Sequence, residues 1–170
     1  MSEQTDTAIN TSRGAPLWRR FASMVYDSFL LLALAMAYGA FVTFLLFLTQ
    51  GDTTGGEYQP MITSELGNAL VLIGLIASLS GFYIFFWCRA GQTAGMRAWR
   101  LQVVERRELP HIKTPGFKNA LVRAPLALLS LLFFGAGYFW GLFNKEGDCL
   151  HDKLSNTRVI LTESRKRKKK

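Results

Sequence analysis

Residues 29–48 read FLLLALAMAYGAFVTFLLFL, twenty positions without a charged side chain or a proline. A helix needs about 20 apolar residues to cross the hydrocarbon core of a bilayer. A buried helix of a soluble protein is rarely apolar on every side over such a length. The run therefore predicts a first transmembrane helix over about residues 19–49.

A second uncharged run covers residues 66–88 and ends in FYIFFWC, followed by Arg89. Aromatic side chains followed by arginine are typical of a helix end at the membrane surface. Small residues recur on one face of this predicted span, and they favour helix packing, although they would also suit a substrate-lined groove. These packing candidates are Gly67, Gly74, Ser78 and Gly81.

A third apolar run, residues 120–143, is interrupted. Arg123 and Pro125 lie near its start, and Gly135 and Gly137 break it further along. The run is compatible with a single span. It is equally compatible with two short helices that meet at the glycines and form a re-entrant hairpin.

The basic residues are unevenly distributed along the chain. In total, 20 Lys and Arg against 12 Asp and Glu give a formal charge of +8, yet residues 49–65 contain no Lys or Arg. Cytoplasmic loops of membrane proteins are enriched in Lys and Arg, so the N-terminus and the segment after the second run are predicted to be cytoplasmic. A third full span would place the most basic part of the chain outside. The hairpin, with a cytoplasmic C-terminus, is therefore favoured.

Two short segments rich in β-branched residues, 100–106 and 157–163, follow the second and third runs. With a cytoplasmic C-terminus they lie on the same side of the membrane and are able to pair as strands. The predicted fold class is therefore an all-α membrane protein. It has two transmembrane helices, a third apolar segment that is broken and re-entrant or else a third span, and a small cytoplasmic β element.

Two charged residues, Arg20 and Asp27, stand at the entry to the first span. Seven residues make nearly two helical turns, so both project from one face, about 10.5 Å apart along the axis. This is too far for a direct contact on a straight helix, so each is expected to have another partner. A carboxylate beside lipid is costly. Asp27 is therefore either a cation or proton site or one half of a structural ion pair.

The sequence carries no clear signature of an enzyme or of a cofactor site. His151 and Asp152 form a candidate acid–base or metal pair, but Cys149 and His151 lack the usual zinc-ligand spacing. A helix-capping Asp152 and a surface His151 are the simpler interpretation. Residues 91–95, GQTAG, lack the phosphate-loop pattern and predict a tight turn. We expect no enzymatic activity, no bound metal and no cofactor.

Three separate motifs occur in order: LWRRFASMVYD at 17–27, GQTAGMRAWRLQVV at 91–104, and LHDKLSNTRVI at 150–160, with GYFWGLFN just before the last. Together they resemble the RDD family of bacterial membrane proteins, over most of residues 16–161. The resemblance implies that the family arginine is Arg20 and that its two aspartates are Asp27 and Asp152. The chain departs from the family at Arg100, where a glycine is common.

The resemblance implies an integral protein of the bacterial inner membrane with a role in transport, and cation/proton exchange is proposed for some members. We therefore expect a transport-associated subunit for a small solute, a cation or protons, which uses an Arg/Asp pair near the cytoplasmic membrane face. A membrane scaffold or assembly module is the alternative.

The expected partners and domain organisation follow from the same reading. Two spans are too few to enclose a path alone, so a homo-oligomer or a membrane-protein partner is expected. The lipid bilayer is the other partner, with anionic lipid at the basic tail and no nucleic acid. Residues 1–15 are predicted to be a disordered N-terminal segment, 16–161 the membrane domain and 162–170 the basic tail.

Overall fold

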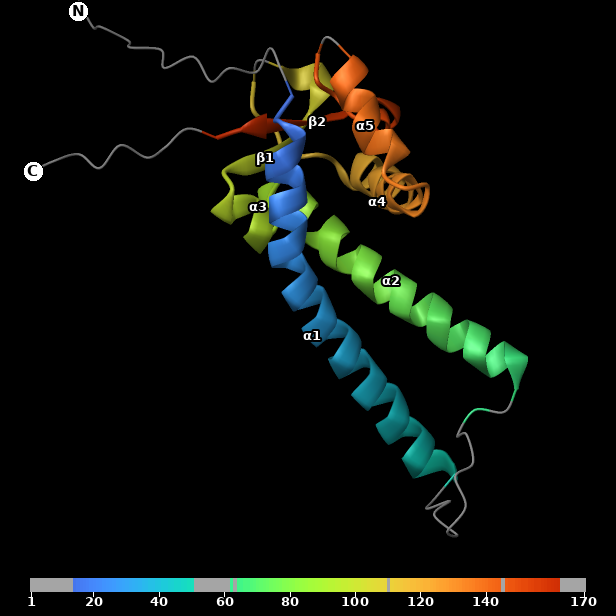
Figure 1. Cartoon of the computed structure of the whole chain (residues 1–170). Helices are drawn as coiled ribbons and strands as arrows, with labels where there is room; N and C mark the ends of the chain where they lie inside the picture. The colour runs from blue at the N-terminus through green and yellow to red at the C-terminus, as the bar shows by residue number, and fades with distance from the viewer. Residues whose placement is uncertain (1–13, 51–61, 63, 110, 145, 163–170) are drawn as a thin grey trace, which may run out of the picture. The chain divides into compact units, whose positions relative to one another are not determined.

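A computed structural model of the chain describes residues 14–50, 62, 64–109, 111–144 and 146–162 (Figure 1). The chain divides into two compact units. The first, here the polar unit, contains the chain up to Asp27 and from Tyr83 onwards, and the second contains Ser28–Phe82. Most of the N-terminal segment and of the predicted basic tail lies outside the described residues.

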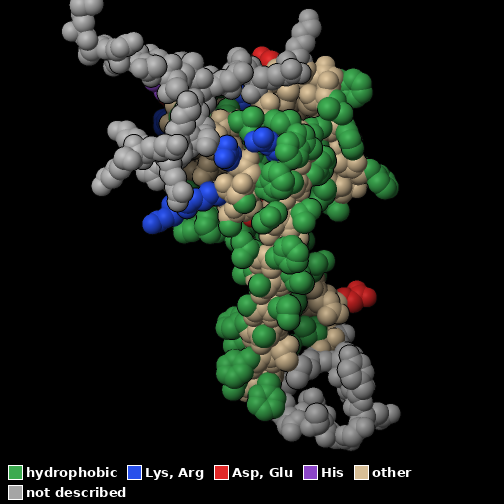
Figure 2. Space-filling view, turned by 60° about the vertical axis from the view of Figure 1, so that its left-hand side comes forward, with side chains coloured by type: hydrophobic (Ala, Val, Ile, Leu, Met, Phe, Trp, Pro, Cys, Tyr) green, Lys and Arg blue, Asp and Glu red, His purple; other side chains and the backbone are tan. Residues whose placement is uncertain are grey.

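Two long helices carry the first two apolar runs. α1 is Leu17–Gln50 and α2 is Glu65–Ala90, and both are long and apolar enough to cross a membrane. Figure 2 shows many hydrophobic side chains along the visible face of these helices. The prediction of two membrane-spanning helices is confirmed, with bounds one or two residues wider at each end.

One close approach between the helices of the unit Ser28–Phe82 depends on a glycine. The hydroxyl of Tyr38 donates a hydrogen bond of 2.9 Å to the carbonyl of Val71. A Cβ atom at Gly74 would lie 2.2 Å from the Tyr38 hydroxyl oxygen. Gly74 therefore gives Tyr38 the room it needs to reach the backbone of α2.

The other three packing candidates on α2 have different surroundings. A Cβ atom at Gly67 would meet Ile62 and Ser64, which both lie just before α2. A Cβ atom at Gly81 would meet nothing within 4 Å. The hydroxyl of Ser78 donates to a carbonyl one turn earlier in its own helix, at 2.8 Å. A helix-packing role for these three residues stays a prediction.

The predicted strands form in the polar unit. β1 (Leu101–Glu105) and β2 (Thr157–Leu161) pair antiparallel, with Leu101 opposite Leu161 and Val103 opposite Val159. Their inward side chains are fully buried and form the centre of the core. The amide of Ala15 donates to the carbonyl of Val159 at 2.8 Å, so Ala15 is tied to the sheet. The small β element is confirmed.

A short helix, α3 (Ala94–Ala98), connects α2 to the sheet, and a turn of 3-10 helix, η1 (Arg106–Glu108), follows β1. Thr93 caps α3, because its side-chain oxygen accepts a hydrogen bond from the amide of Met96. The chain then turns into β1 at Arg100, which has a φ of +57°. Arg100 thus occupies a left-handed conformation, which glycine would adopt without strain.

The third apolar run is bent. α4 (Phe117–Leu132) and α5 (Ala136–Phe143) meet at 95°. The chain turns through two left-handed residues, Phe134 with a φ of +51° and Gly135 with a φ of +75°. The run is therefore two helices that meet at an elbow. A last short helix, α6 (Leu150–Leu154), leads from the elbow back to β2.

Candidate functional site

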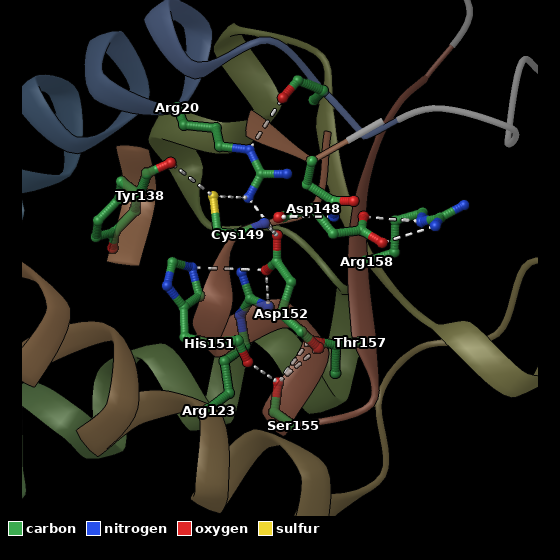
Figure 3. Close-up of polar contacts among 12 residues, drawn as sticks. Arg20, Arg123, Tyr138, Asp148, Cys149, His151, Asp152, Ser155, Thr157 and Arg158 are labelled. Atoms are coloured by element: carbon green, nitrogen blue, oxygen red, sulfur yellow. Dashed lines mark hydrogen bonds and ion pairs between the residues drawn. The ribbon is translucent and has the colours of Figure 1, made fainter. Parts of the chain in front are cut away.

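Asp152 lies at the centre of a buried polar cluster in the polar unit. Its carboxylate accepts 2.6 Å from Arg20 Nη1, at the start of α1, and 2.5 Å from Arg123 Nη1, in α4. It also accepts from the amide of Cys149 at 3.1 Å, which completes a capping box at the start of α6. Figure 3 shows side chains from these separate segments converging on the carboxylate. Arg20, Arg123, Cys149, His151 and Asp152 are called the Asp152 cluster below.

Ion pairs between Asp152 and two arginines offset part of the cost of burying this cluster. Asp152 is fully buried, and the two arginines that contact it are each 4% exposed. Although burial alone would raise the pKa of Asp152, the guanidinium groups of Arg20 and Arg123 hold it well below its usual range. The carboxylate is thus ionised at physiological pH, and both arginines depend on it as their shared counter-ion.

Arg123 has two further partners that fix its side chain. Its Nη1 donates to the hydroxyl of Thr157 at 2.6 Å, and its guanidinium carbon lies 4.9 Å from the centre of the Trp87 ring. A cation over the face of an indole is attracted by the ring electrons. Arg123 therefore joins α4 to α2 and β2 in addition to α6.

His151 and Cys149 are neutral members of the cluster. Burial lowers the pKa of His151 to about 3, so the imidazole is uncharged at neutral pH. Its ring lies 4.5 Å from the Tyr138 ring, and only 1% of the residue is exposed. Burial raises the pKa of Cys149 to about 12, and its Sγ accepts 3.2 Å from Arg20 Nη1. The helix-capping role expected of Asp152 is confirmed, whereas the expectation of a surface His151 is wrong.

The donor atoms of Cys149, His151 and Asp152 lie within 4.8 Å of one another, as in a metal site. Their surroundings do not suit a cation. Both carboxylate oxygens of Asp152 already accept from guanidinium groups, and a thiol with a raised pKa is a poor ligand because metals bind the thiolate. A divalent cation would also face the charges of Arg20 and Arg123.

A second ion-pair group fastens the segment before α6 to the strands. Arg158 of β2 donates to both oxygens of Asp148, at 2.9 and 2.7 Å. Arg106 forms ion pairs with Asp148, at 3.3 Å, and with Glu146. A bidentate contact fixes both the distance and the relative orientation of the guanidinium and carboxylate groups. The group therefore holds the start of α6, and with it Asp152, against the sheet.

Asp27 lies outside both groups. It is 1% exposed, and its carboxylate accepts 2.5 Å from the hydroxyl of Thr93 and 2.9 Å from the amide of Gly95. These donors are neutral, and no ion pair joins Asp27 to a basic side chain in the described part of the chain. A Cβ atom at Gly95 would lie 2.2 Å from the carbonyl oxygen of Ser23. Only glycine therefore lets the α3 backbone approach this carboxylate so closely.

The structure separates the two charged residues that stand at the entry to α1. Each has another partner, as expected: Arg20 bonds to Asp152, and Asp27 bonds to the start of α3. The two residues thus belong to two distinct arrangements. One is a buried carboxylate paired with two arginines, and the other is a single buried carboxylate among neutral donors.

Two important residues were missed as site residues at the level of sequence. Arg123 stood out as a charge inside an apolar run, which is a signal in itself, because such a charge needs a partner in the protein. Thr93 belongs to the GQTAG turn, and its motif gives no indication that its hydroxyl turns toward α1. That contact depends on the tertiary fold.

Comparison with known proteins gives one match. Residues 14–156 match the sequence model of the RDD family. No curated protein and no solved structure matches the chain significantly.

Proposed function

The chain belongs to the RDD family, and we propose that it is a transport-associated membrane subunit in which Asp27 binds and releases a proton or a small cation. The observation that carries the proposal is the burial of Asp27 on a helix long enough to span a membrane, with neutral donors as its hydrogen-bond partners. A carboxylate of this kind is costly to keep charged, and ionisable residues in membrane helices are functional candidates by default.

The contacts of Asp27 suggest how a change in its charge would be transmitted. Two donors, the Thr93 hydroxyl and the Gly95 amide, favour the ionised form. Protonation would place a hydrogen between the Asp27 carboxyl and one of these donors and so weaken the contact. Because both donors lie at the start of α3, binding at Asp27 would shift this helix and the turn that leads into β1.

Arg20 has a structural role in this proposal. It bonds to Asp152 and to the carbonyl of Ala15, so it is committed to the Asp152 cluster. Asp27 alone is therefore assigned the coupling role. The two long helices are too few to enclose a path, so the proposal includes a homo-oligomer or a membrane-protein partner. It includes no enzymatic step and no cofactor.

We place the protein in the bacterial inner membrane with the N-terminus, the segment after α2 and the C-terminus in the cytoplasm. The excess of Lys and Arg in these segments supports this orientation. Hydrogen bonds link Ala15 to Val159 and β1 to β2, which supports a common side for both ends of the chain. A reporter fused after Lys170 tests the placement, and an external C-terminus would contradict it.

Ion flux in proteoliposomes tests the role of Asp27. The matched set is wild type, Asp27→Asn, Asp27→Glu and the control Glu65→Gln, which changes an exposed carboxylate. A pH-sensitive dye inside the vesicles reports protons, and radioactive sodium or rubidium reports cations. We expect flux in wild type and the control, a partial flux with Asp27→Glu, and none with Asp27→Asn at equal protein content. Equal flux in Asp27→Asn, or no flux in wild type, would overturn the proposal.

The alternative is a membrane scaffold, and the Asp152 cluster favours it. This cluster ties together α1, α4 and α6 through one carboxylate that two arginines share, which suits a rigid platform better than a moving part. A scaffold would retain its partner in Asp27→Asn and lose it when residues 163–170 are removed. Co-purification of these two variants with membrane partners separates the two functions.

A further inference from the structure

The elbow of α4 and α5 exposes an extended apolar surface of the polar unit. Residues 124–143 contain no charged side chain. At the apex, Phe133 is 70% exposed and Phe134 is 97% exposed. Further along the two arms, Leu132 and Phe143 are 68% and 88% exposed. A soluble protein rarely presents so large a charge-free apolar surface to water.

The inner sides of both arms are held by the polar unit. On α4, Ala120, Arg123 and Ala124 are buried, and Arg123 reaches the Asp152 cluster. On α5, Tyr138 and Gly141 are buried. The apex therefore projects, while both ends of the elbow return to the same compact unit.

The lengths of the arms set how deep the elbow can reach. α4 has 16 residues and α5 has 8. At about 1.5 Å per residue these helices are roughly 24 and 12 Å long, and each falls short of the ~30 Å hydrocarbon core. A 95° bend shortens their combined reach further. The elbow has the dimensions of an element that enters one leaflet.

The backbone at the apex is unfavourable for the residue it carries. Phe134 adopts a φ of +51°, a left-handed conformation that is strained for a residue with a side chain. Its ring is also the most exposed of the large hydrophobic side chains among the described residues. The strained backbone thus holds an aromatic ring outward. A contact between this ring and another molecule would offset the strain.

The concave side of the elbow is apolar as well. A cavity of about 270 Å³ lies there, and its walls are mainly apolar, with Leu126, Leu129 and Phe133 on the α4 side and Leu150 and Leu154 on α6. Two polar residues, Ser130 and His151, also line it. Apolar cavities of this kind are poor sites for water, which needs two or more polar partners. Acyl chains fill such a space without that requirement.

We propose that the α4–α5 elbow is a leaflet anchor, whose apex inserts among the phospholipid acyl chains on the side of the membrane where α1 begins and α2 ends. The chain itself supplies the argument for this occupant, because its two candidate spans bring a bilayer to the polar unit. A protein partner would be expected to meet a polar rim, whereas residues 124–143 carry no charged side chain and their polar Ser130 and Tyr138 are buried. The inference rests on the proposed topology and is independent of transport at Asp27.

Photo-cross-linking in phospholipid vesicles tests the anchor. Phe134→p-benzoylphenylalanine keeps an aromatic ring at the apex, and the same substitution at the exposed Arg107 serves as the control. We expect the Phe134 variant to gain the mass of a phospholipid on irradiation, several-fold more often than the control. Equal lipid adducts at both positions, or cross-links mainly to a second copy of the chain, would overturn the proposal.

A second measurement separates a leaflet anchor from a full span. Glu146→Cys and Arg107→Cys are each introduced alone into a chain with Cys88→Ser, in which the buried Cys149 is retained as the background control. Each variant is labelled with a membrane-impermeant maleimide on sealed vesicles of known orientation. A leaflet anchor gives labelling of both positions from the same side. Labelling from opposite sides would overturn the anchor and the proposed topology while leaving the flux test of Asp27 unaffected.

Discussion

Arg20 Nη1 lies 2.6 Å from Asp152 Oδ2, although 132 residues separate the two side chains in sequence. Both are buried, and the carboxylate is shared with Arg123. The contact closes the polar unit by joining the start of the first long helix to the last short helix. Two of the three residues implied by the family resemblance thus act together, and the third, Asp27, acts elsewhere.

Asp152→Asn should strongly destabilise the polar unit. The substitution keeps the size of the side chain but leaves two buried guanidinium groups without a counter-ion. Loss of one partner from a buried ion pair costs about 3–5 kcal/mol. The measurement is chemical or thermal unfolding of the purified protein in nanodiscs, followed by tryptophan fluorescence.

Glu108→Gln is the matched control for this change. Glu108 also pairs with a basic residue, Lys113, at 3.3 Å, but the pair is exposed. Exposed ion pairs contribute at most about 1 kcal/mol, so this variant should unfold close to wild type. Similar losses of stability in Asp152→Asn and Glu108→Gln would show that the burial of Asp152 is not what makes its ion pairs important.

His151 should make stability depend on pH in a mildly acidic range. The ordinary pKa of histidine is 6.5, and burial lowers that of His151 to about 3. Between these values the unfolded chain binds a proton that the folded chain does not, so stability falls as the pH falls. The slope is at most about 1.4 kcal/mol per pH unit. The slope is measured from the unfolding midpoints of the protein between pH 7 and pH 4.

The other histidine supplies the comparison. His151→Gln should flatten the pH dependence, whereas His111→Gln, at an exposed position, should retain it. An equal slope in wild type and His151→Gln would mean that carboxylates alone govern the acid sensitivity. Asp152 also makes stability fall with pH, because its pKa is lower in the folded chain than in the unfolded chain. Its contribution is lost only in more acid solution, below its ordinary pKa of 3.8.

The elements could be predicted from the sequence wherever one physical requirement dominates. The charge-free run 29–48 has to lie in an apolar environment, and the β-branched segments at β1 and β2 pair as strands. The elbow was one of two alternatives, because Gly135 permits a turn without requiring one. Its 95° bend also depends on Phe134 in a left-handed conformation, which no composition rule predicts.

The candidate site could be predicted only in part. Spacing on one helix correctly excluded a direct contact between Arg20 and Asp27. It could not identify their partners, because these come from residues up to 132 positions away. His151 shows the limit most clearly. A lone histidine beside a capping aspartate is ordinarily exposed, and only the packing of Tyr138 against its ring reveals its burial.

Gly95→Ala should disturb the surroundings of Asp27. The added Cβ atom would lie 2.2 Å from the carbonyl oxygen of Ser23 and 2.9 Å from the Asp27 carboxylate, and a backbone carbonyl cannot swing away. Overpacking of this kind costs about 1–3 kcal/mol. Gly81→Ala is the control, since its Cβ atom would meet nothing within 4 Å. Thermal unfolding compares the two, and equal midpoints would contradict the close approach of α3 to α1.

Zinc should neither bind to nor stabilise the Asp152 cluster. The oxygens of Asp152 are occupied by guanidinium groups, and burial raises the pKa of Cys149 to about 12. In a Cys88→Ser background, Cys149 should react with a thiol reagent only after unfolding, at the same rate with zinc or with a chelator. An unfolding midpoint that rises with zinc, and falls again with the chelator, would assign a metal to this cluster.

Arg100→Gly should stabilise the polar unit. Arg100 has a φ of +57°, and its carbonyl accepts a hydrogen bond of 2.9 Å from the amide of Thr162, so the turn is fixed by the sheet. Glycine adopts this conformation without the strain of a Cβ atom, which should raise the free energy of unfolding by up to about 1 kcal/mol. Arg97→Gly removes the same charge from inside α3, where glycine should lower stability by about 1 kcal/mol. Opposite shifts of the two unfolding midpoints would confirm that backbone conformation decides the effect. A loss of stability in both variants would show instead that the Arg100 side chain contributes more than its strained backbone costs.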